Sequence, residues 1–96
     1  MKGDLSKRLI NQISTYGSAA SVDKIVLFGS RARGDNMDRS DIDLAVYGGD
    51  FDSFYWNIKE NIHSLLLFDV VRMDGNVSKD LENEIDRDGI ILYEKN

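Results

Sequence analysis

Cysteine is absent from this sequence of 96 residues, which excludes disulfide bonds and thiolate metal sites. Long apolar runs are absent as well. None approaches the roughly 20 residues that cross a bilayer, and the first five residues lack the apolar segment of a secretion signal. These absences predict a soluble cytoplasmic protein that does not associate with a membrane.

Basic tracks are also missing, because 12 Lys and Arg residues stand against 17 Asp and Glu residues, a formal net charge of −5. Proteins that hold long nucleic acids need such tracks, so we expect no direct binding of long nucleic acid. A small nucleotide is compatible if it binds through a cation, because the metal supplies the positive charge. A basic or amphipathic protein partner is compatible too.

The remaining composition is that of an ordinary globular protein, with 42% hydrophobic and 30% charged residues. A chain of this length has room for one small hydrophobic core. We therefore expect a single domain over residues 1–96.

Apolar residues at helical spacing predict a first helix that is capped by Asp4 and ends at Gly17. A second helix is expected over residues 51–66. Its apolar stripe consists of Phe51, Phe54, Ile58, Ile62 and Leu65. Trp56 and His63 lie opposite this stripe, so Trp56 is expected to be exposed, either as a partner contact or packed locally. We interpret His63 as a solvated surface residue.

Four short β-rich runs predict strands over residues 24–28, 42–47, 67–71 and 90–93. Between the last two, Ser78 is expected to cap a short helix in which Leu81 and Ile85 share one face. Because helices and strands alternate, we expect an α/β architecture with a sheet covered by helices.

Two carboxylates interrupt the second of these apolar runs. Asp41 and Asp43 are two residues apart, so in a strand both side chains point to the same face, while Ile42, Leu44 and Val46 point to a core. Ala45 continues the acidic face and, being small, is expected to leave space above the strand. Paired hard oxygen ligands suit Mg²⁺ with nucleotide phosphates. Aspartates are also common in turns and helix caps, but aspartate is disfavoured inside a strand, which favours a function.

A candidate phosphate-binding turn directly follows the first strand. Gly29 would let the backbone approach a ligand, Ser30 adds a hydroxyl, and residues 31–33 favour a short helical turn that Gly34 ends. A plain strand-to-helix turn with Ser30 as N-cap explains these residues equally well. A P-loop is excluded, because residues 35–36 are Asp-Asn where that motif needs Lys and Ser or Thr.

A third carboxylate, Asp69, lies in the apolar run of residues 66–71. Burying it without a partner would be costly, and a neighbouring strand that brings it beside Asp41 and Asp43 would remove the cost through shared metals. The alternative is an aspartate at a strand end that faces water. Asp74 precedes a glycine and fits a turn better than a metal site.

The candidate residues match the G-S-x10-D-x-D pattern, which consists here of Gly29-Ser30, ten residues and Asp41-Ile42-Asp43. In this pattern and in the amino-acid sequence of residues 29–46, the chain resembles the minimal nucleotidyltransferase (MNT) branch of the polymerase-β nucleotidyltransferase superfamily. The resemblance extends through residues 67–71 to 88–93.

This resemblance implies the polymerase-β-like nucleotidyltransferase fold, an α/β (α+β) fold with a mixed sheet. It implies that the turn at Gly29 and Ser30 holds the nucleotide triphosphate, and that Asp41 and Asp43 bind two Mg²⁺ ions. The third aspartate, matched by Asp69, would share one metal and help to activate the acceptor hydroxyl. Two such metals clamp the attacking and leaving oxygens of an in-line displacement.

The two arginines after this turn have two interpretations. Arg31 and Arg33 are candidate phosphate contacts. Ion pairs with Asp35, Asp38 or Asp41 account for them at least as well.

The acceptor is expected to be a protein, because the chain devotes nearly all its residues to the core fold. MNT proteins similar to this one are antitoxins of prokaryotic HEPN-domain ribonuclease toxins and transfer AMP from ATP onto a toxin tyrosine. The resemblance therefore implies a cytoplasmic protein adenylyltransferase antitoxin. The alternative is a non-catalytic nucleotide-binding module that neutralises its partner by binding. The sequence is compatible with ATP or another nucleotide, with Mg²⁺ or Mn²⁺, and with a homo- or hetero-oligomer.

Overall fold

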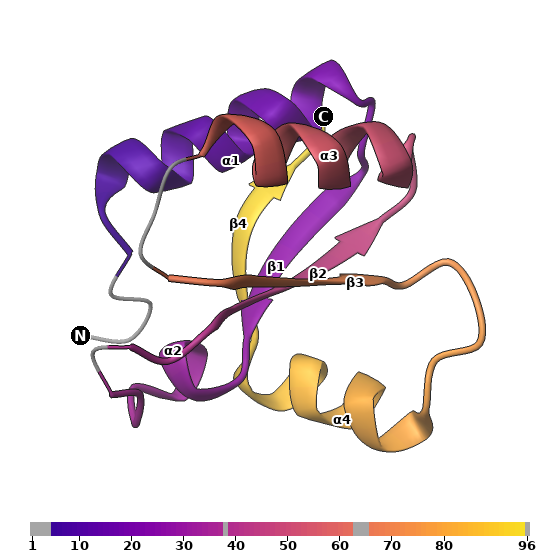
Figure 1. The fold of residues 1–96 in the computed structure, drawn as a ribbon. Coiled ribbons are helices and arrows are strands. Elements are labelled where there is room, and N and C mark those ends of the chain that lie inside the picture. Colours follow the sequence, from indigo (N-terminus) through magenta and orange to yellow (C-terminus); the bar gives the residue numbers. More distant parts are fainter. Residues whose placement is uncertain (1–4, 38, 63–65, 96) are drawn as a thin grey trace.

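The computed structural model describes residues 5–37, 39–62 and 66–95, in which helices and strands alternate along the chain (Figure 1). Four strands of this part form a sheet in the order β3-β2-β1-β4. The elements are α1 (Lys7–Ala19), β1 (Lys24–Phe28), α2 (Ser30–Arg33), β2 (Ile42–Tyr47), α3 (Phe51–Asn61), β3 (Phe68–Arg72), α4 (Lys79–Asp88) and β4 (Ile90–Glu94).

The sheet is mixed, as the family resemblance implies. The central strand β1 pairs antiparallel with β2 on one side and with β4 on the other, whereas β2 pairs parallel with β3. A parallel pair needs a crossover connection, and α3 supplies it. In this arrangement, the C-terminal end of β1 lies beside the N-terminal ends of β2 and β3. This end of the strands is called one edge of the sheet below.

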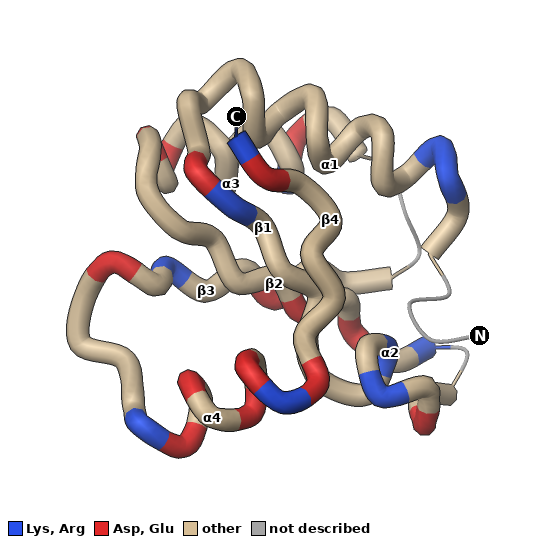
Figure 2. The backbone as a smooth tube through the Cα atoms, turned by 180° about the vertical axis from the view of Figure 1, so that it is seen from behind, with Lys and Arg blue, Asp and Glu red and all other residues tan. Residues whose placement is uncertain are grey.

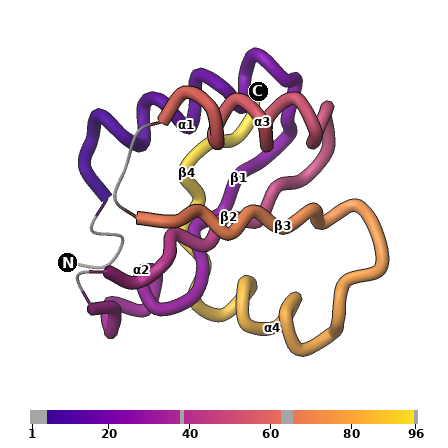
Figure 3. The backbone as a smooth tube through the Cα atoms, in the orientation of Figure 1, coloured from indigo at the N-terminus to yellow at the C-terminus, as the bar shows by residue number. Residues whose placement is uncertain are grey.

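Helices cover both faces of the sheet. α1 and α3 lie together over one face, and α4 lies under the other (Figures 1 and 3). Since side chains alternate along a strand, every second strand residue enters the core beneath α1 and α3. The largest fully buried side chains there are Ile13, Ile25, Leu27, Ile42, Leu44, Phe54 and Ile58. A smaller buried cluster on the α4 side contains Val26, Phe28, Ala45 and Ile85.

Both predicted ends of the first helix are wrong. The N-cap is Ser6, whose hydroxyl accepts a hydrogen bond from the backbone N–H of Leu9 at 3.2 Å, and Asp4 lies outside the described residues. Gly17 does not end α1 but is buried within it, and the C-cap is Ala20. The reason is packing: a Cβ at Gly17 would lie 2.7 Å from Cδ1 of Ile25, so glycine allows the helix to approach the sheet.

The remaining elements lie close to their predicted positions. α3 ends at Asn61 rather than residue 66, and residues 63–65, which include His63 and Leu65, lie outside the described part. The cap of α4 is Ser78, as predicted, and Leu81 and Ile85 both join the cluster under the sheet.

The predicted exposure of Trp56 is confirmed, with 58% of its surface accessible. Its ring packs edge-on against Tyr55, with centroids 5.2 Å apart. No helix within the described ranges is both long and apolar enough to cross a membrane.

Candidate functional site

The turn between β1 and α2 depends on Gly29. Its backbone has φ +75° and ψ −156°, a conformation that residues with a side chain rarely adopt. A Cβ at Gly29 would also overlap the carboxylate of Asp43. Glycine therefore lets the Asp43 carboxylate lie directly against the turn.

The short helical turn predicted after Gly29 is confirmed as α2. The N-cap position is Gly29 rather than Ser30, and Ser30 is the first helical residue. The turn closes where the backbone N–H of Gly34, in the left-handed conformation, donates to the carbonyl of Ser30 at 2.9 Å. The interpretation of Ser30 as an N-cap is therefore wrong.

The strand register brings two of the three candidate carboxylates together. Asp43 in β2 lies opposite Phe28 of β1 on one side and opposite Asp69 of β3 on the other. Asp41 comes just before β2 rather than inside it. Asp41 and Asp69 are exposed and Asp43 is half-buried. The suggested burial cost of Asp69 does not arise, because β3 is an edge strand.

The electrostatics of Asp43 reflect this crowding. The pKa of its carboxyl is raised to about 6, first because the group is partly buried and then because Asp69, Asp41 and Glu84 are negatively charged. Arg33 opposes the rise. A carboxyl held in such a negative environment favours either a proton or a bound cation.

The donor chemistry of this edge fits a hard divalent cation. Asp41, Asp43 and Asp69 offer carboxylate oxygens from neighbouring backbone positions, which is the ligand type that Mg²⁺ prefers. Within the described residues, no group of three or more His, Cys, Asp or Glu side chains converges closely enough to hold an ion. Two of the three carboxylates are exposed side chains that can change rotamer.

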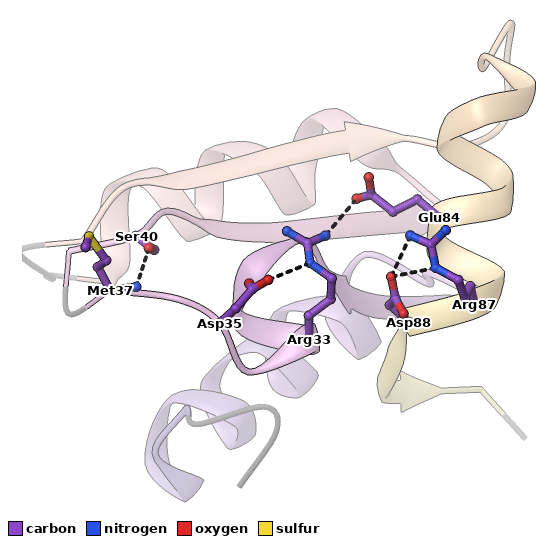
Figure 4. Close-up of polar contacts among 7 residues, drawn as sticks. All are labelled: Arg33, Asp35, Met37, Ser40, Glu84, Arg87 and Asp88. Carbon is purple, nitrogen blue, oxygen red and sulfur yellow. Dashed lines mark hydrogen bonds and ion pairs between the residues drawn. The ribbon is translucent and has the colours of Figure 1, made fainter.

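The two candidate arginines have clear structural partners. Arg31 is buried, with 4% of its surface accessible, and its Nε donates to the carbonyl of Ser40 at 3.0 Å. Arg33 pairs with Asp35 (Nε to Oδ2, 3.2 Å) and more loosely with Glu84 of α4 (Nη1 to Oε2, 3.9 Å), as Figure 4 shows. The predicted ion pair between Arg33 and Asp35 is therefore confirmed. Asp38 lies outside the described residues.

The expected space above Ala45 is absent. Ala45 is fully buried in the cluster that includes Ile85, so α4 covers the acidic face of β2 from that residue onward. The open part of this face is limited to the edge that carries Asp43 and Asp69. α4 thus forms one wall of the candidate site.

Glu84 is a residue of this site that sequence reasoning misses. It lies between Leu81 and Ile85, the two inward-facing residues of α4, so the helical spacing could have placed it next to the sheet. Figure 2 shows acidic residues along α4 and basic residues on α2, on the same side of the sheet. Asp74, in contrast, lies in a bend after β3, which agrees with the predicted turn position, and it accepts a hydrogen bond from the N–H of Gly48 at 2.8 Å.

Comparison with known families gives one match, which covers most of the chain. The family described as "Polymerase beta, Nucleotidyltransferase" matches residues 8–96. No curated protein sequence matches significantly.

Two crystal structures show the same fold. The first is a toxin-antitoxin with AMP-PNP, 21% identical, with a TM-score of 0.69 over 90% of this chain and 73% of that one. The second is the toxin-antitoxin MntA-HpeT, 23% identical, with the same TM-score and coverage. It is a variant in which two aspartates, two residues apart, are replaced by glutamate.

Proposed function

The chain belongs to the polymerase β nucleotidyltransferase family, and we propose that it is an antitoxin that transfers AMP from ATP to a tyrosine hydroxyl of a cognate HEPN ribonuclease toxin. The observation that carries this proposal is the arrangement at one edge of the sheet. There the Asp43 carboxylate lies against the Gly29 turn and beside Asp69. A phosphate-binding turn next to paired carboxylates suits nucleotidyl transfer.

The positions of the carboxylates support the roles that we propose for them. Asp41, Asp43 and Asp69 would hold two Mg²⁺ ions, which would neutralise charge on the phosphates. Asp69 is exposed on the edge strand β3, where an acceptor can approach it. In the proposed reaction it takes the proton of the acceptor hydroxyl as that oxygen attacks the α-phosphorus. The bond from the α-phosphorus to the leaving pyrophosphate then breaks.

The nucleotide side of the site is the turn itself. Gly29 and Ser30 are proposed to hold the triphosphate. Arg33 contacts Asp35 through Nε and Glu84 loosely through Nη1, and its other guanidinium N–H groups could contact phosphate. Arg31 is proposed to have a positioning role instead, because its hydrogen bond to the Ser40 carbonyl holds the residue that precedes Asp41.

The partner and the nucleotide are supported by the fold neighbours. Both are toxin-antitoxin structures, and one of them contains AMP-PNP, an ATP analogue. The aspartates replaced in the other have the spacing of Asp41 and Asp43. The net charge of −5 also suits a basic or amphipathic protein partner.

The proposal is tested with the purified chain, ATP, Mg²⁺ and the HEPN protein encoded by the adjacent gene. Intact-mass measurement should show the partner gaining the mass of one AMP. The Asp41→Asn/Asp43→Asn variant should give no gain, whereas Asp52→Asn, an exposed carboxylate on α3, should act like the unsubstituted chain. An unmodified partner with the unsubstituted chain would contradict the proposal.

Rescue of growth separates catalysis from binding. If transfer neutralises the toxin, cells that carry the Asp41→Asn/Asp43→Asn variant should remain poisoned. Full rescue by that variant, at equal expression, would instead mean that the chain neutralises its partner by binding alone.

A further inference from the structure

We propose that Met37 and Leu67 form an acceptor-side patch, which receives apolar side chains next to the acceptor hydroxyl of a protein partner. This inference rests on the proposed function and adds the surface through which the acceptor reaches the carboxylates. In the following paragraphs, "acceptor-side patch" means these two residues.

Both side chains are strongly exposed although both are large and apolar. Met37 is 79% exposed and Leu67 is 71% exposed, the two highest values among the exposed large hydrophobic residues of the described part. The other two are Trp56 on α3 and Ile91 on β4. Exposed side chains of this kind are the ones that gain most from burial against a partner.

Met37 is presented by a turn with defined bonds. Its backbone N–H donates to the Ser40 hydroxyl at 2.9 Å, and its carbonyl accepts from the Ser40 N–H at 3.1 Å (Figure 4). The Ser40 carbonyl is in turn held by the buried Arg31 at 3.0 Å. Met37 is therefore exposed on an anchored turn, which lowers the entropy lost when a partner binds it.

Leu67 lies at the same edge from the other side. Its carbonyl accepts the backbone N–H of Ile42 at 2.9 Å, so it is adjacent to the start of β2. It precedes Asp69 by two residues and comes just before the edge strand β3. The acceptor-side patch thus flanks the carboxylates along the chain, because Met37 precedes Asp41 by four residues and Leu67 precedes Asp69 by two.

The position of the patch favours a polypeptide as its occupant. The Gly29 turn and α2 form the proposed nucleotide side, whereas the patch lies where the chain of β3 meets the loop before Asp41. A tyrosine in a protein segment brings neighbouring side chains with it, and apolar neighbours would cover Met37 and Leu67.

The test uses the Met37→Ser/Leu67→Ser variant with the same HEPN protein, ATP and Mg²⁺. Its matched control is Trp56→Ser/Ile91→Ser, which removes the two other exposed hydrophobic residues. We expect the KM for the protein acceptor to rise about tenfold in the patch variant. The kcat, the affinity for AMP-PNP and the melting temperature should stay unchanged, and the control should keep the original KM.

Three results would overturn the inference. An unchanged KM in the patch variant would remove the patch while leaving the transferase function intact. Weaker AMP-PNP binding by the patch variant would assign the two residues to the nucleotide instead. No transfer by the unsubstituted chain would contradict the proposed function itself, and this inference with it.

Discussion

At the scale of single residues, Asp43 is the carboxylate of the site whose ionised form is most clearly destabilised by its surroundings. It is half-buried beside Asp69 and near Asp41 and Glu84, which together raise the pKa of its carboxyl to about 6. The unfolded value is about 3.8. The folded chain without a cation therefore binds this proton more tightly than the unfolded chain, so the site costs stability when the carboxyl is ionised.

Replacing Asp43 with asparagine should consequently raise the stability of the chain while it removes a carboxylate that the proposed transfer needs. Protonation of Asp43 stabilises the folded chain fully below about pH 4, and this stabilisation is lost as the pH rises through about 6. At pH 7.5 without divalent cations, Asp43→Asn should raise the free energy of unfolding by about 1 kcal/mol, after reduction for solvent screening. Urea unfolding at pH 5 and pH 7.5 should show the difference shrinking at the lower pH. Equal effects at both pH values would contradict this explanation.

The turn beside Asp43 depends on the identity of Gly29. Its positive φ and the overlap of any Cβ with the Asp43 carboxylate predict that Gly29→Ala distorts the turn and displaces Asp43. Stability should fall by roughly 1–2 kcal/mol in chemical denaturation, and transfer activity should be lost. Gly75→Ala is the matched control, because open space surrounds that position and its φ is ordinary. A fully active Gly29→Ala variant would show that the turn does not position Asp43.

At the scale of elements, the sequence predicts strands better than helix ends. The apolar runs locate β1 and β2 at their observed residues, because alternating burial leaves a strong local pattern. Gly17 is misjudged as a stop, since its actual function is to let α1 approach Ile25, a contact distant in sequence. The neighbourhood of Asp43 and Asp69 was anticipated only as a hypothesis, and the contact between Arg33 and Glu84 was not predicted at all. Both depend on how separate elements pack.

The N-cap of α4 offers a test at this scale, because α4 forms a wall of the site. The Ser78 hydroxyl accepts the N–H of Leu81 at 3.1 Å. Ser78→Ala should lower the free energy of unfolding by about 1 kcal/mol. Ser53→Ala in the first turn of α3 is the control, because there the Asp50 side chain is the cap and Ser53 contributes only its backbone N–H. A Ser78→Ala loss no larger than that of the control would show that the cap does not stabilise α4.

At the scale of the whole molecule, the proposed nucleotide site should couple to folding. A ligand that binds only the folded chain stabilises it by about 2.7 kcal/mol at one hundred times its dissociation constant. AMP-PNP with Mg²⁺ should therefore raise the melting temperature of the unsubstituted chain. The Asp41→Asn/Asp43→Asn variant should show little rise, although it folds. An equal rise in both proteins would place the nucleotide elsewhere on the molecule.

The fold also explains how the residues of the proposed site come together. One edge of the sheet collects the end of β1, the starts of β2 and β3, and the α2 turn, while α4 closes one side. Met37 and Leu67, in the segments before β2 and β3, are exposed to solvent. In the proposed function, the nucleotide binds at the turn and the protein acceptor binds next to the start of β3.

The most direct measurement of the central claim follows the fate of the two ends of ATP. The unsubstituted chain, Mg²⁺ and the adjacent-gene HEPN protein are incubated with ATP labelled at either the α- or the γ-phosphate. The account predicts that the partner acquires the α-label but not the γ-label, and that one pyrophosphate is released for each AMP transferred. Transfer of the γ-label, or stable binding of the partner with neither label transferred, would contradict it.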